Sequence, residues 1–501
     1  MTLRSVLDKI CGDWKVMLAA LSLLCAGAFA AQTIGAWYRL RHFKGPFPAT
    51  FSNIWLVRAL MNGQMNFEML EANRKYGSLV RIGPNMLVTD DPALMRRMNA
   101  VRSPYRRSDW YTGLRFDPSR DNVLSQMDED THTELRTKMA IGYAGKENEI
   151  FEHSINHNVL ALIKLIDSKY ITTNTEYRPM DFGRKAQYFT LDVISHVAYG
   201  KPFGFLATDT DLYQYIATSE KAVPVAMMVT IFPWFNHVLT SSFMKRLLPS
   251  ATDAIGFGKI IGFTKEVVDQ RFGPDAKDQR DMLGSFIRHG LTRDEAESET
   301  LLQIIAGSDT TATAIRTTFL YIITTPRVYT KLLAEISDAT LSSPISDVEA
   351  RTLPYLQAVI KEGLRIWPPA VGLMAKKVPP EGDTINGMYV PGGTRIGYGG
   401  FSILRNKKIW GEDADVFRPE RWLEGEGIKV LEQTWEVIFN AGRYQCLGKN
   451  VALMELNKVF VELFRHFEFS VVDPTNPWKS MCMGIFAQSE MWLLVTRREK
   501  L

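Results

Sequence analysis

One long helical pattern limits the folds open to this chain more than any other feature of its sequence. From Thr292 to Pro326, more than thirty residues pass without an internal proline. Thr292 and Glu295 have the spacing of a capping box, in which each side chain bonds to the other residue's backbone N–H group. Because a helix rises about 1.5 Å per residue, this one would cross an entire domain. The sequence therefore predicts a large fold organised around a central helix.

The remaining chain favours a mainly α fold with a smaller β region. The middle of the chain, from about residue 128 to 365, reads as helices, and a last helix fits Gly448 to Phe467. Two short apolar runs between residues 79 and 89, joined by Gly83-Pro84-Asn85, predict a hairpin. Turns are expected between Pro379 and Trp422, where glycine and proline become frequent. At 501 residues, the chain forms either several domains or one fold organised around a buried group.

Charge and cysteine content argue against two classes of protein. The formal net charge is only +4, from 59 basic and 55 acidic residues, with no long block of like charge. No basic arm for nucleic acid is therefore predicted. The four cysteines are too few and too scattered for a disulfide framework or a zinc site, which fits a reducing compartment: Cys11, Cys25, Cys446 and Cys482.

The amino-terminal region carries the pattern of a membrane anchor. The 23 residues from 16 to 38 contain no charged side chain, and a helix of that length spans roughly 35 Å, enough to cross a bilayer. The expected division is a tail, a transmembrane helix, a basic and proline-rich hinge, and the main folded domain: residues 1–15, 16–38, 39–50 and 51–501. The alternative is a cleaved signal peptide ending near Ala28-Phe29-Ala30, which the preceding Asp8 and Asp13 disfavour.

Cys446 stands in a short loop that favours thiolate chemistry. It lies between Gly442 and Gly448, immediately before the predicted last helix. The free N–H groups and partial positive charge at a helix amino terminus lower the pKa of a thiol. The two glycines would let a flat macrocycle approach the backbone. A thiolate bound to haem iron donates electron density and helps to cleave O2. The alternative for a single cysteine is a buried structural residue, and the surrounding sequence favours the ligand.

The segment from Phe439 to Gly448 resembles the haem-binding loop of the cytochrome P450 superfamily, whose pattern is Phe-x-x-Gly-x-Arg-x-Cys-x-Gly. The resemblance implies a cytochrome P450 fold with an amino-terminal transmembrane helix, and haem b with Cys446 as the axial ligand of its iron. Gly-Arg-Tyr-Gln-Cys-Leu-Gly is similar to fungal microsomal members of specialised metabolism, such as the pisatin demethylase group. Residues 51–501 would then form a haem-thiolate monooxygenase domain.

One position of this loop departs from the family pattern. Tyr444 replaces the arginine that contacts a haem propionate in the family, and Arg443 stands one residue earlier. Arg443 would either reach back to the same propionate or face outward and help to dock an acidic reductase. The resemblance implies three further propionate contacts: His132, Arg136 and Lys376. His132 and Arg136 are four residues apart and share a helix face, whereas lysine would make a point-charge contact where the family has arginine.

Glu362, Arg365 and Arg421 resemble the family's Glu-Arg-Arg triad. Glutamate and arginine three residues apart lie on one helix face, which on a surface would be an ordinary ion pair. By resemblance, the three side chains would form a buried charge cluster that fixes the cysteine loop.

Residues 306–311 of the long helix, Ala-Gly-Ser-Asp-Thr-Thr, resemble the family's oxygen-activation motif. Glycine and threonine in one turn weaken a helix, so a local opening is expected here. Thr310 and Asp309 are the candidate catalytic residues by resemblance. Thr310 would hydrogen-bond the oxygen that is being reduced, and Asp309 would relay protons from solvent.

These resemblances imply an enzyme that inserts one oxygen atom of O2 into a hydrophobic small molecule, in a fungal secondary-metabolite pathway. NADPH-cytochrome P450 reductase would be a separate partner, because the chain has no room for a flavin domain. The expected location is the endoplasmic reticulum membrane, crossed once, with the catalytic domain in the cytosol. The alternatives are a haem-thiolate isomerase or dehydratase that needs no reductase, and a non-catalytic haem sensor. The presence of Asp309 and Thr310 disfavours both.

Apolar segments are assigned to the substrate and to membrane lipid by the same resemblance. The segments Tyr105–Phe116, Ala370–Met374 and Met481–Phe486 are expected to line the substrate site. Val223–Phe235 has 13 residues and no charge, so it is too short to span a bilayer. It suits either a buried core or a second membrane contact near the substrate entrance, and the resemblance favours the contact.

Overall fold

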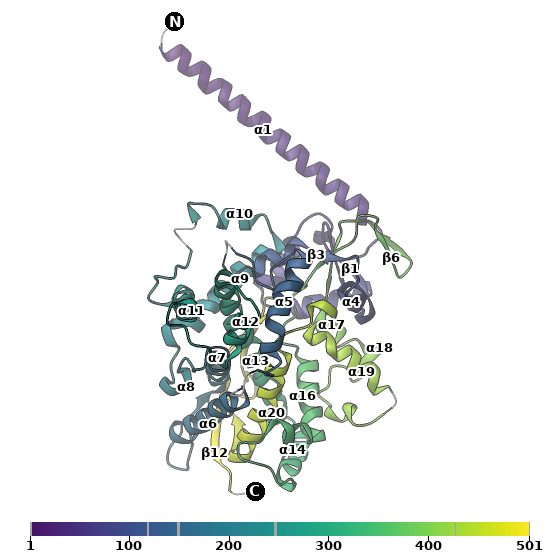
Figure 1. The fold of residues 1–501 in the computed structure, drawn as a ribbon. Coiled ribbons are helices and arrows are strands. Elements are labelled where there is room, and N and C mark those ends of the chain that lie inside the picture. The colour runs from purple at the N-terminus through teal and green to yellow at the C-terminus, as the bar shows by residue number, and fades with distance from the viewer. Residues whose placement is uncertain (1–2, 118–119, 148–150, 245–247, 426, 500–501) are drawn as a thin grey trace.

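The structure, a computed structural model, describes residues 3–117, 120–147, 151–244, 248–425 and 427–499. Side chains are not described at positions 3–13, 15, 25, 26 and 29, so Cys11 and Cys25 lie outside this description. The architecture is mainly helical with small sheets, as the sequence predicts. Figure 1 shows one body of packed helices from which a single long helix projects.

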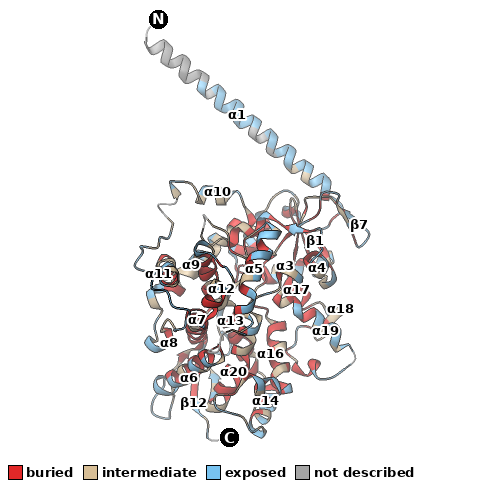
Figure 2. Cartoon of the chain, viewed as in Figure 1, coloured by how far each residue is buried: buried red, intermediate tan, exposed pale blue. Residues whose placement is uncertain are grey.

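The projecting helix is α1 (Leu3–Leu40), and it contains the whole predicted anchor. Its described side chains are largely exposed up to the point where it meets the body (Figure 2). Among the described residues, none of the helices combines the length and apolar character needed to span a bilayer. The predicted transmembrane helix over residues 16–38 is therefore not confirmed.

The segment expected as a hinge, residues 39–50, is docked on the body. Leu40 and Phe43 are buried, and the Lys44 carbonyl accepts a hydrogen bond from the Arg81 N–H group at 2.8 Å. The buried Arg81 guanidinium donates to the Ala36 carbonyl at 3.1 Å and to the Thr50 carbonyl at 2.9 Å. A cation beside the last carbonyls of a helix is favourable. These contacts fix the base of α1 to strand β1 (Leu79–Gly83).

The predicted central helix is α13 (Arg293–Ile323), which has 31 residues and begins with the expected capping box at Thr292. It runs through the middle of the body (Figure 1). Its main partners are α7 (Phe182–Tyr199), α11 (Gly256–Phe272), α16 (Pro354–Ile366) and α20 (Lys449–His466). The last of these, α20, confirms the predicted final helix.

The strands form small sheets beside the helices. The predicted hairpin is confirmed as β1 (Leu79–Gly83) paired antiparallel with β2 (Met86–Thr89). It belongs to a five-stranded sheet in the order β1-β2-β8-β5-β3. The other strands are β3 (Arg106–Arg107), β4 (Met180–Asp181), β5 (Lys376–Lys377), β6 (Asp383–Ile385), β7 (Met388–Val390), β8 (Arg395–Tyr398), β9 (Phe467–Val471), β10 (Lys479–Cys482), β11 (Phe486–Ser489) and β12 (Trp492–Arg497).

The remaining helices surround α13 and the sheets. The α-helices are α2 (Ile54–Met61), α3 (Met65–Tyr76), α4 (Pro92–Asn99), α5 (Glu129–Tyr143), α6 (Phe151–Lys169), α8 (Phe205–Thr208), α9 (Tyr215–Ile231), α10 (Phe235–Leu239), α12 (Met282–Arg288), α14 (Pro326–Asp338), α15 (Asp347–Arg351), α17 (Gly400–Ile403), α18 (Lys407–Trp410) and α19 (Ile428–Trp435). The 3-10 helices are η1 (Phe47–Thr50), η2 (Asp109–Leu114), η3 (Leu212–Gln214), η5 (Pro419–Trp422), η6 (Glu436–Phe439) and η7 (Gly442–Tyr444). The largest buried cluster joins α6, α7, α13, α16 and α20, and a second lies between α2, α3, β2 and α9.

Candidate active site

The loop that carries Cys446 runs from η6 through η7 to the start of α20. The Cys446 N–H group donates to the Phe439 carbonyl at 2.7 Å, which closes the loop. Gly442 has φ +60°, and a Cβ there would lie 2.2 Å from the Asn99 carbonyl oxygen. Its missing side chain is thus explained by a tight turn against α4, rather than by the close approach of a macrocycle that the sequence predicts. At Gly448, an added Cβ would meet only the Cys446 sulfur, at 3.9 Å.

The amino end of α20 lowers the pKa of the Cys446 thiol, as the sequence predicts. The N–H groups of Gly448 and Lys449 and the Arg136 guanidinium each lower the pKa of Cys446. Burial has the larger, opposite effect, and the pKa of Cys446 is raised overall. The residue nevertheless retains solvent-accessible surface. A bound metal cation lowers the pKa of a thiol and would favour the thiolate here.

The central helix is partly accessible in the turn that ends at Thr310. Ala306 is exposed and Thr310 half-buried, whereas residues 311–320 are all buried. The Thr310 hydroxyl donates to the Ala306 carbonyl at 2.8 Å. The helix is continuous here, without the local opening that the sequence predicts. Gly307 has another role, because a Cβ at this position would lie 2.7 Å from the Ile194 side chain of α7.

Asp309 is turned toward α7. Its carboxylate accepts a hydrogen bond from the Gln187 amide, and the Gln187 carbonyl oxygen accepts one from Arg316 at 2.8 Å. Burial raises the pKa of Asp309 to about 6, and the nearby Arg316 cation opposes this shift. A carboxyl group with a pKa near neutrality is suited to exchanging protons.

His132 and Lys376 meet in one buried polar cluster with Arg107. Arg107 Nη2 lies 3.2 Å from His132 Nε2, and because a guanidinium can only donate, the ring proton belongs on Nδ1. Burial lowers the pKa of His132 to about 3, so the ring is neutral. Within the described part of the chain, His132 Nδ1, Lys376 Nζ and Arg107 Nε are all buried without a hydrogen-bond partner. Three unpartnered donors of this kind fit the carboxylate of a bound group.

The other residues assigned to this region have different surroundings. Arg136 lies on α5 within electrostatic range of both Cys446 and Arg107. Arg443 forms an ion pair with Glu129 at 3.3 Å. Tyr444, which stands in the family's arginine position, also donates to Glu129, at 2.5 Å. The structure thus places these residues in two neighbouring groups. His132 and Lys376 belong to one, and Arg443 and Tyr444 belong to the other.

The Glu-Arg-Arg triad forms as predicted and is completely buried. Glu362 pairs with Arg365 at 2.8 Å and with Arg421 at 3.0 Å. Arg365 also donates to the Leu404 and Ala414 carbonyls, at 2.8 and 2.7 Å. The cluster therefore ties α16 to the irregular segment between β8 and η5.

Aromatic rings link this cluster to the cysteine loop. Trp422 donates to Glu362 at 3.0 Å and packs against Trp435, with ring centroids 6.4 Å apart. Trp435 in turn packs on Phe439, whose carbonyl holds the Cys446 N–H group. The predicted effect of the triad on the loop thus has a continuous chain of contacts.

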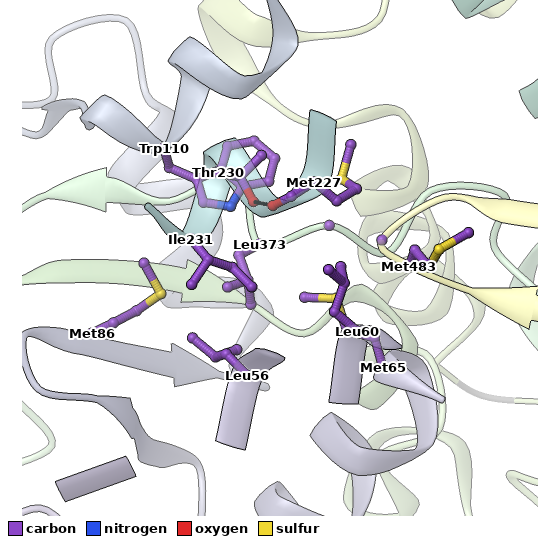
Figure 3. Close-up of a pocket in the computed structure, with 12 residues that line it drawn as sticks. Leu56, Leu60, Met65, Met86, Trp110, Met227, Thr230, Ile231, Leu373 and Met483 are labelled. Atoms are coloured by element: carbon purple, nitrogen blue, oxygen red, sulfur yellow. Dashed lines mark hydrogen bonds between the residues drawn. The ribbon is translucent and has the colours of Figure 1, made fainter. Parts of the chain in front are cut away.

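An apolar pocket brings together the segments expected to line the substrate site (Figure 3). Trp110, Leu373 and Met483 come from the three predicted lining segments, and Met227 and Ile231 come from α9. The other lining residues are Leu56, Leu60, Met65, Met86, Thr230, Gly372 and Gly484. The lining thus comes from the three predicted segments and from α2, α3, β2 and α9, and includes no residue of α13 or of the cysteine loop.

Comparison with known proteins decides the family. A family model described as Cytochrome P450 matches residues 43–494, which include every site residue described above. This chain is a cytochrome P450. It is similar to the cytochrome P450 monooxygenase ABA1 of Pyricularia oryzae, with 43% identity over 99% of this chain and 100% of that protein. The cytochrome P450 monooxygenase aba1 of Botryotinia fuckeliana is 40% identical, over 92% of each chain.

The enzyme is accordingly a P450 monooxygenase, and its cofactor is haem b with a thiolate on the iron. When bound, this haem supplies the site for O2 activation. Cys446 would hold the iron, and the unpartnered donors of His132, Lys376 and Arg107 would hold its carboxylates. On α13, Thr310 would hold a proton at its Oγ1, and Asp309 would take up and release protons at its carboxylate. The monooxygenase names of the relatives give no support to the isomerase, dehydratase or sensor alternatives.

Three residues of this site could not be identified from the sequence. Arg107 completes the cluster of unpartnered donors, Gln187 holds Asp309, and Glu129 holds Tyr444 and Arg443. Each acts on a partner more than 20 positions away in the chain. Arg107 falls inside the segment Tyr105–Phe116, which is predicted to line the substrate site, but nothing near it in the sequence indicates a carboxylate contact.

Proposed function

We propose that this P450 monooxygenase oxidises a largely hydrophobic small molecule in fungal secondary metabolism. The observation that carries the proposal is the apolar pocket of Figure 3, whose lining residues include no charged side chain. Its one hydroxyl, on Thr230, already donates to the Met227 carbonyl at 2.7 Å. Four methionines, with their flexible side chains, would allow the walls to adapt to an apolar ligand: Met65, Met86, Met227 and Met483.

Electrons would come from NADPH through a separate NADPH-cytochrome P450 reductase. This proposal is supported by the family match over residues 43–494, because P450 monooxygenases generally receive their electrons from a redox partner.

Membrane lipid is the second proposed partner, with the endoplasmic reticulum membrane as the site and the catalytic domain in the cytosol. Exposed apolar side chains along α1 support this proposal, because large apolar surfaces mark interaction sites: Val16, Met17, Leu18, Leu21, Leu23, Leu24 and Ile34. On the segment 223–235, Trp234 is 62% exposed and Val225 is 50% exposed, whereas Met227 and Ile231 face the pocket. Helix α10, which follows Trp234, lies at the same end of the body as the base of α1 (Figure 1).

The substrate proposal is tested by titrating the purified haem protein with candidate molecules. Binding next to the iron changes the haem absorption spectrum. Apolar ligands should give saturable spectral changes and should accelerate NADPH consumption only when reductase is present. Product should appear with the same ligands. Saturable binding confined to charged, polar molecules would contradict the substrate class, and product formation from NADPH without reductase would contradict the partner.

A further inference from the structure

Glu129, the first residue of α5, holds two side chains of the cysteine loop. Its carboxylate accepts hydrogen bonds from the Tyr444 hydroxyl at 2.5 Å and from Arg443 at 3.3 Å. The side chain of Glu129 is only 10% exposed, and that of Arg443 is 20% exposed. Charge-assisted bonds shielded from water are stronger than neutral, exposed ones. These contacts therefore join the loop of the haem ligand to the amino end of α5.

Arg443 is engaged by this carboxylate, whereas Lys376 is not engaged by any. Lys376 is 1% exposed, and its Nζ lacks a hydrogen-bond partner among the described residues. Nζ lies 3.0 Å from the centroid of the Tyr444 ring, so the ammonium sits directly beside the family's arginine position. Burial, followed by the neighbouring Arg107, lowers the pKa of Lys376. A buried ammonium in this situation needs an anion.

The net charge of these side chains leads to the same conclusion, that an anion is needed beside Lys376. Around Tyr444, once an anion holds Lys376 as an ammonium, Arg107, Lys376 and Arg443 contribute three positive charges and Glu129 one negative charge, which leaves a surplus of two. Because Arg443 neutralises Glu129, the surplus resides on Lys376 and Arg107. Haem b carries a pair of propionates, which would match this surplus.

We propose that Tyr444, Glu129 and Arg443 form a clamp that positions the cysteine loop, and that Lys376 takes over the propionate contact of the missing arginine. The clamp holds the loop against α5 through Glu129. Arg443 is then a positioning residue, because its partner is Glu129 rather than the haem.

The first test compares haem retention, which requires neither substrate nor reductase and so stands apart from the proposed function. Lys376→Met removes the unpartnered cation, and haem occupancy after purification should fall several-fold. Arg443→Gln should keep wild-type occupancy. Occupancy that falls in Arg443→Gln and not in Lys376→Met would overturn the assignment.

The second test asks whether Arg443 and Glu129 act as a pair. The ferrous carbon monoxide complex has a red-shifted Soret band while the thiolate is bound, and its rate of loss in mild denaturant reports the stability of the loop. Arg443→Gln and Tyr444→Phe should each speed this loss by about tenfold, or about 1.4 kcal/mol. Adding Glu129→Gln to Arg443→Gln removes both charges and should bring the rate back toward that of the wild type.

A matched control lies on the same helix. Glu134 pairs with Lys138 at 2.9 Å and is 67% exposed, so Glu134→Gln should leave the Soret band as stable as in the wild type. If the double variant decays as fast as Arg443→Gln alone, the clamp is refuted, because Arg443 would then act on something other than Glu129.

Discussion

Replacing Glu362 by glutamine should destabilise the protein more than almost any other single change. The carboxylate accepts five hydrogen bonds, from Arg365 Nε and Nη2, Arg421 Nε, Trp422 Nε1 and Arg418 N, at 2.8 to 3.0 Å. Both of its oxygens face at least two donors. A glutamine NH2 group would therefore point at donors in either orientation, and two buried guanidinium groups would lose their counter-charge.

The magnitude follows from the burial of this cluster. Glu362 and Arg365 side chains are 0% exposed, and that of Arg421 is 2% exposed. Removing one partner of a buried ion pair costs about 3–5 kcal/mol, a large share of the roughly 5–15 kcal/mol that stabilises a folded protein. Glu362→Gln should accordingly lower the free energy of unfolding in urea, followed by circular dichroism, by at least about 3 kcal/mol.

A neighbouring exposed pair provides the control. Lys361 and Glu432 lie 2.7 Å apart, with side chains 30% and 47% exposed, so Glu432→Gln should cost less than about 1 kcal/mol. A loss in Glu362→Gln no larger than in Glu432→Gln would refute the reasoning, because burial would then not decide the cost.

Three further predictions concern protons and lipid. Thr310→Ala removes the hydroxyl at the exposed turn of α13. NADPH consumption should continue while the product formed per NADPH falls about tenfold, the effect of losing one hydrogen bond. An unchanged yield of product per NADPH would exclude a role of Thr310 in proton delivery. The pKa of Asp309 is raised to about 6, so its contribution to stability is lost as the pH rises from about 4 to 6. Asp309→Asn should gain stability over wild type at pH 7 but not at pH 4, and an equal difference at both would contradict this. A chain lacking residues 1–38 should sediment with anionic phospholipid vesicles, and Trp234→Glu in that chain should abolish the sedimentation. The control Trp492→Glu changes a tryptophan of β12 that is 44% exposed and should have no effect. Full solubility of the truncated wild type in the presence of vesicles would contradict the second membrane contact.

Features set by local spacing could be predicted from the sequence. The capping box at Thr292, the hairpin around Gly83-Pro84-Asn85 and the final helix each depend on residues close in the chain. The Glu-Arg-Arg triad was predictable because a family motif supplied the distant Arg421. These elements are confirmed.

Long-range partners could not be predicted in the same way. Glu129 at a helix start looks like an ordinary residue that favours the helix dipole, and its contact with Tyr444 spans 315 positions. Gln187 is one amide on a buried helix, and nothing nearby relates it to Asp309. Gly307 was expected to open the helix, but only the structure shows the Ile194 side chain against it.

The central claim is that Cys446 binds the haem iron, and one spectrum tests it most directly. Purified Cys446→Ser protein, reduced and exposed to carbon monoxide, should lack the strongly red-shifted Soret band that thiolate ligation gives. Cys482→Ser is the matched control, since Cys482 is buried in β10 away from the loop and should not affect the band. A Cys446→Ser protein that keeps the red-shifted band would contradict the account.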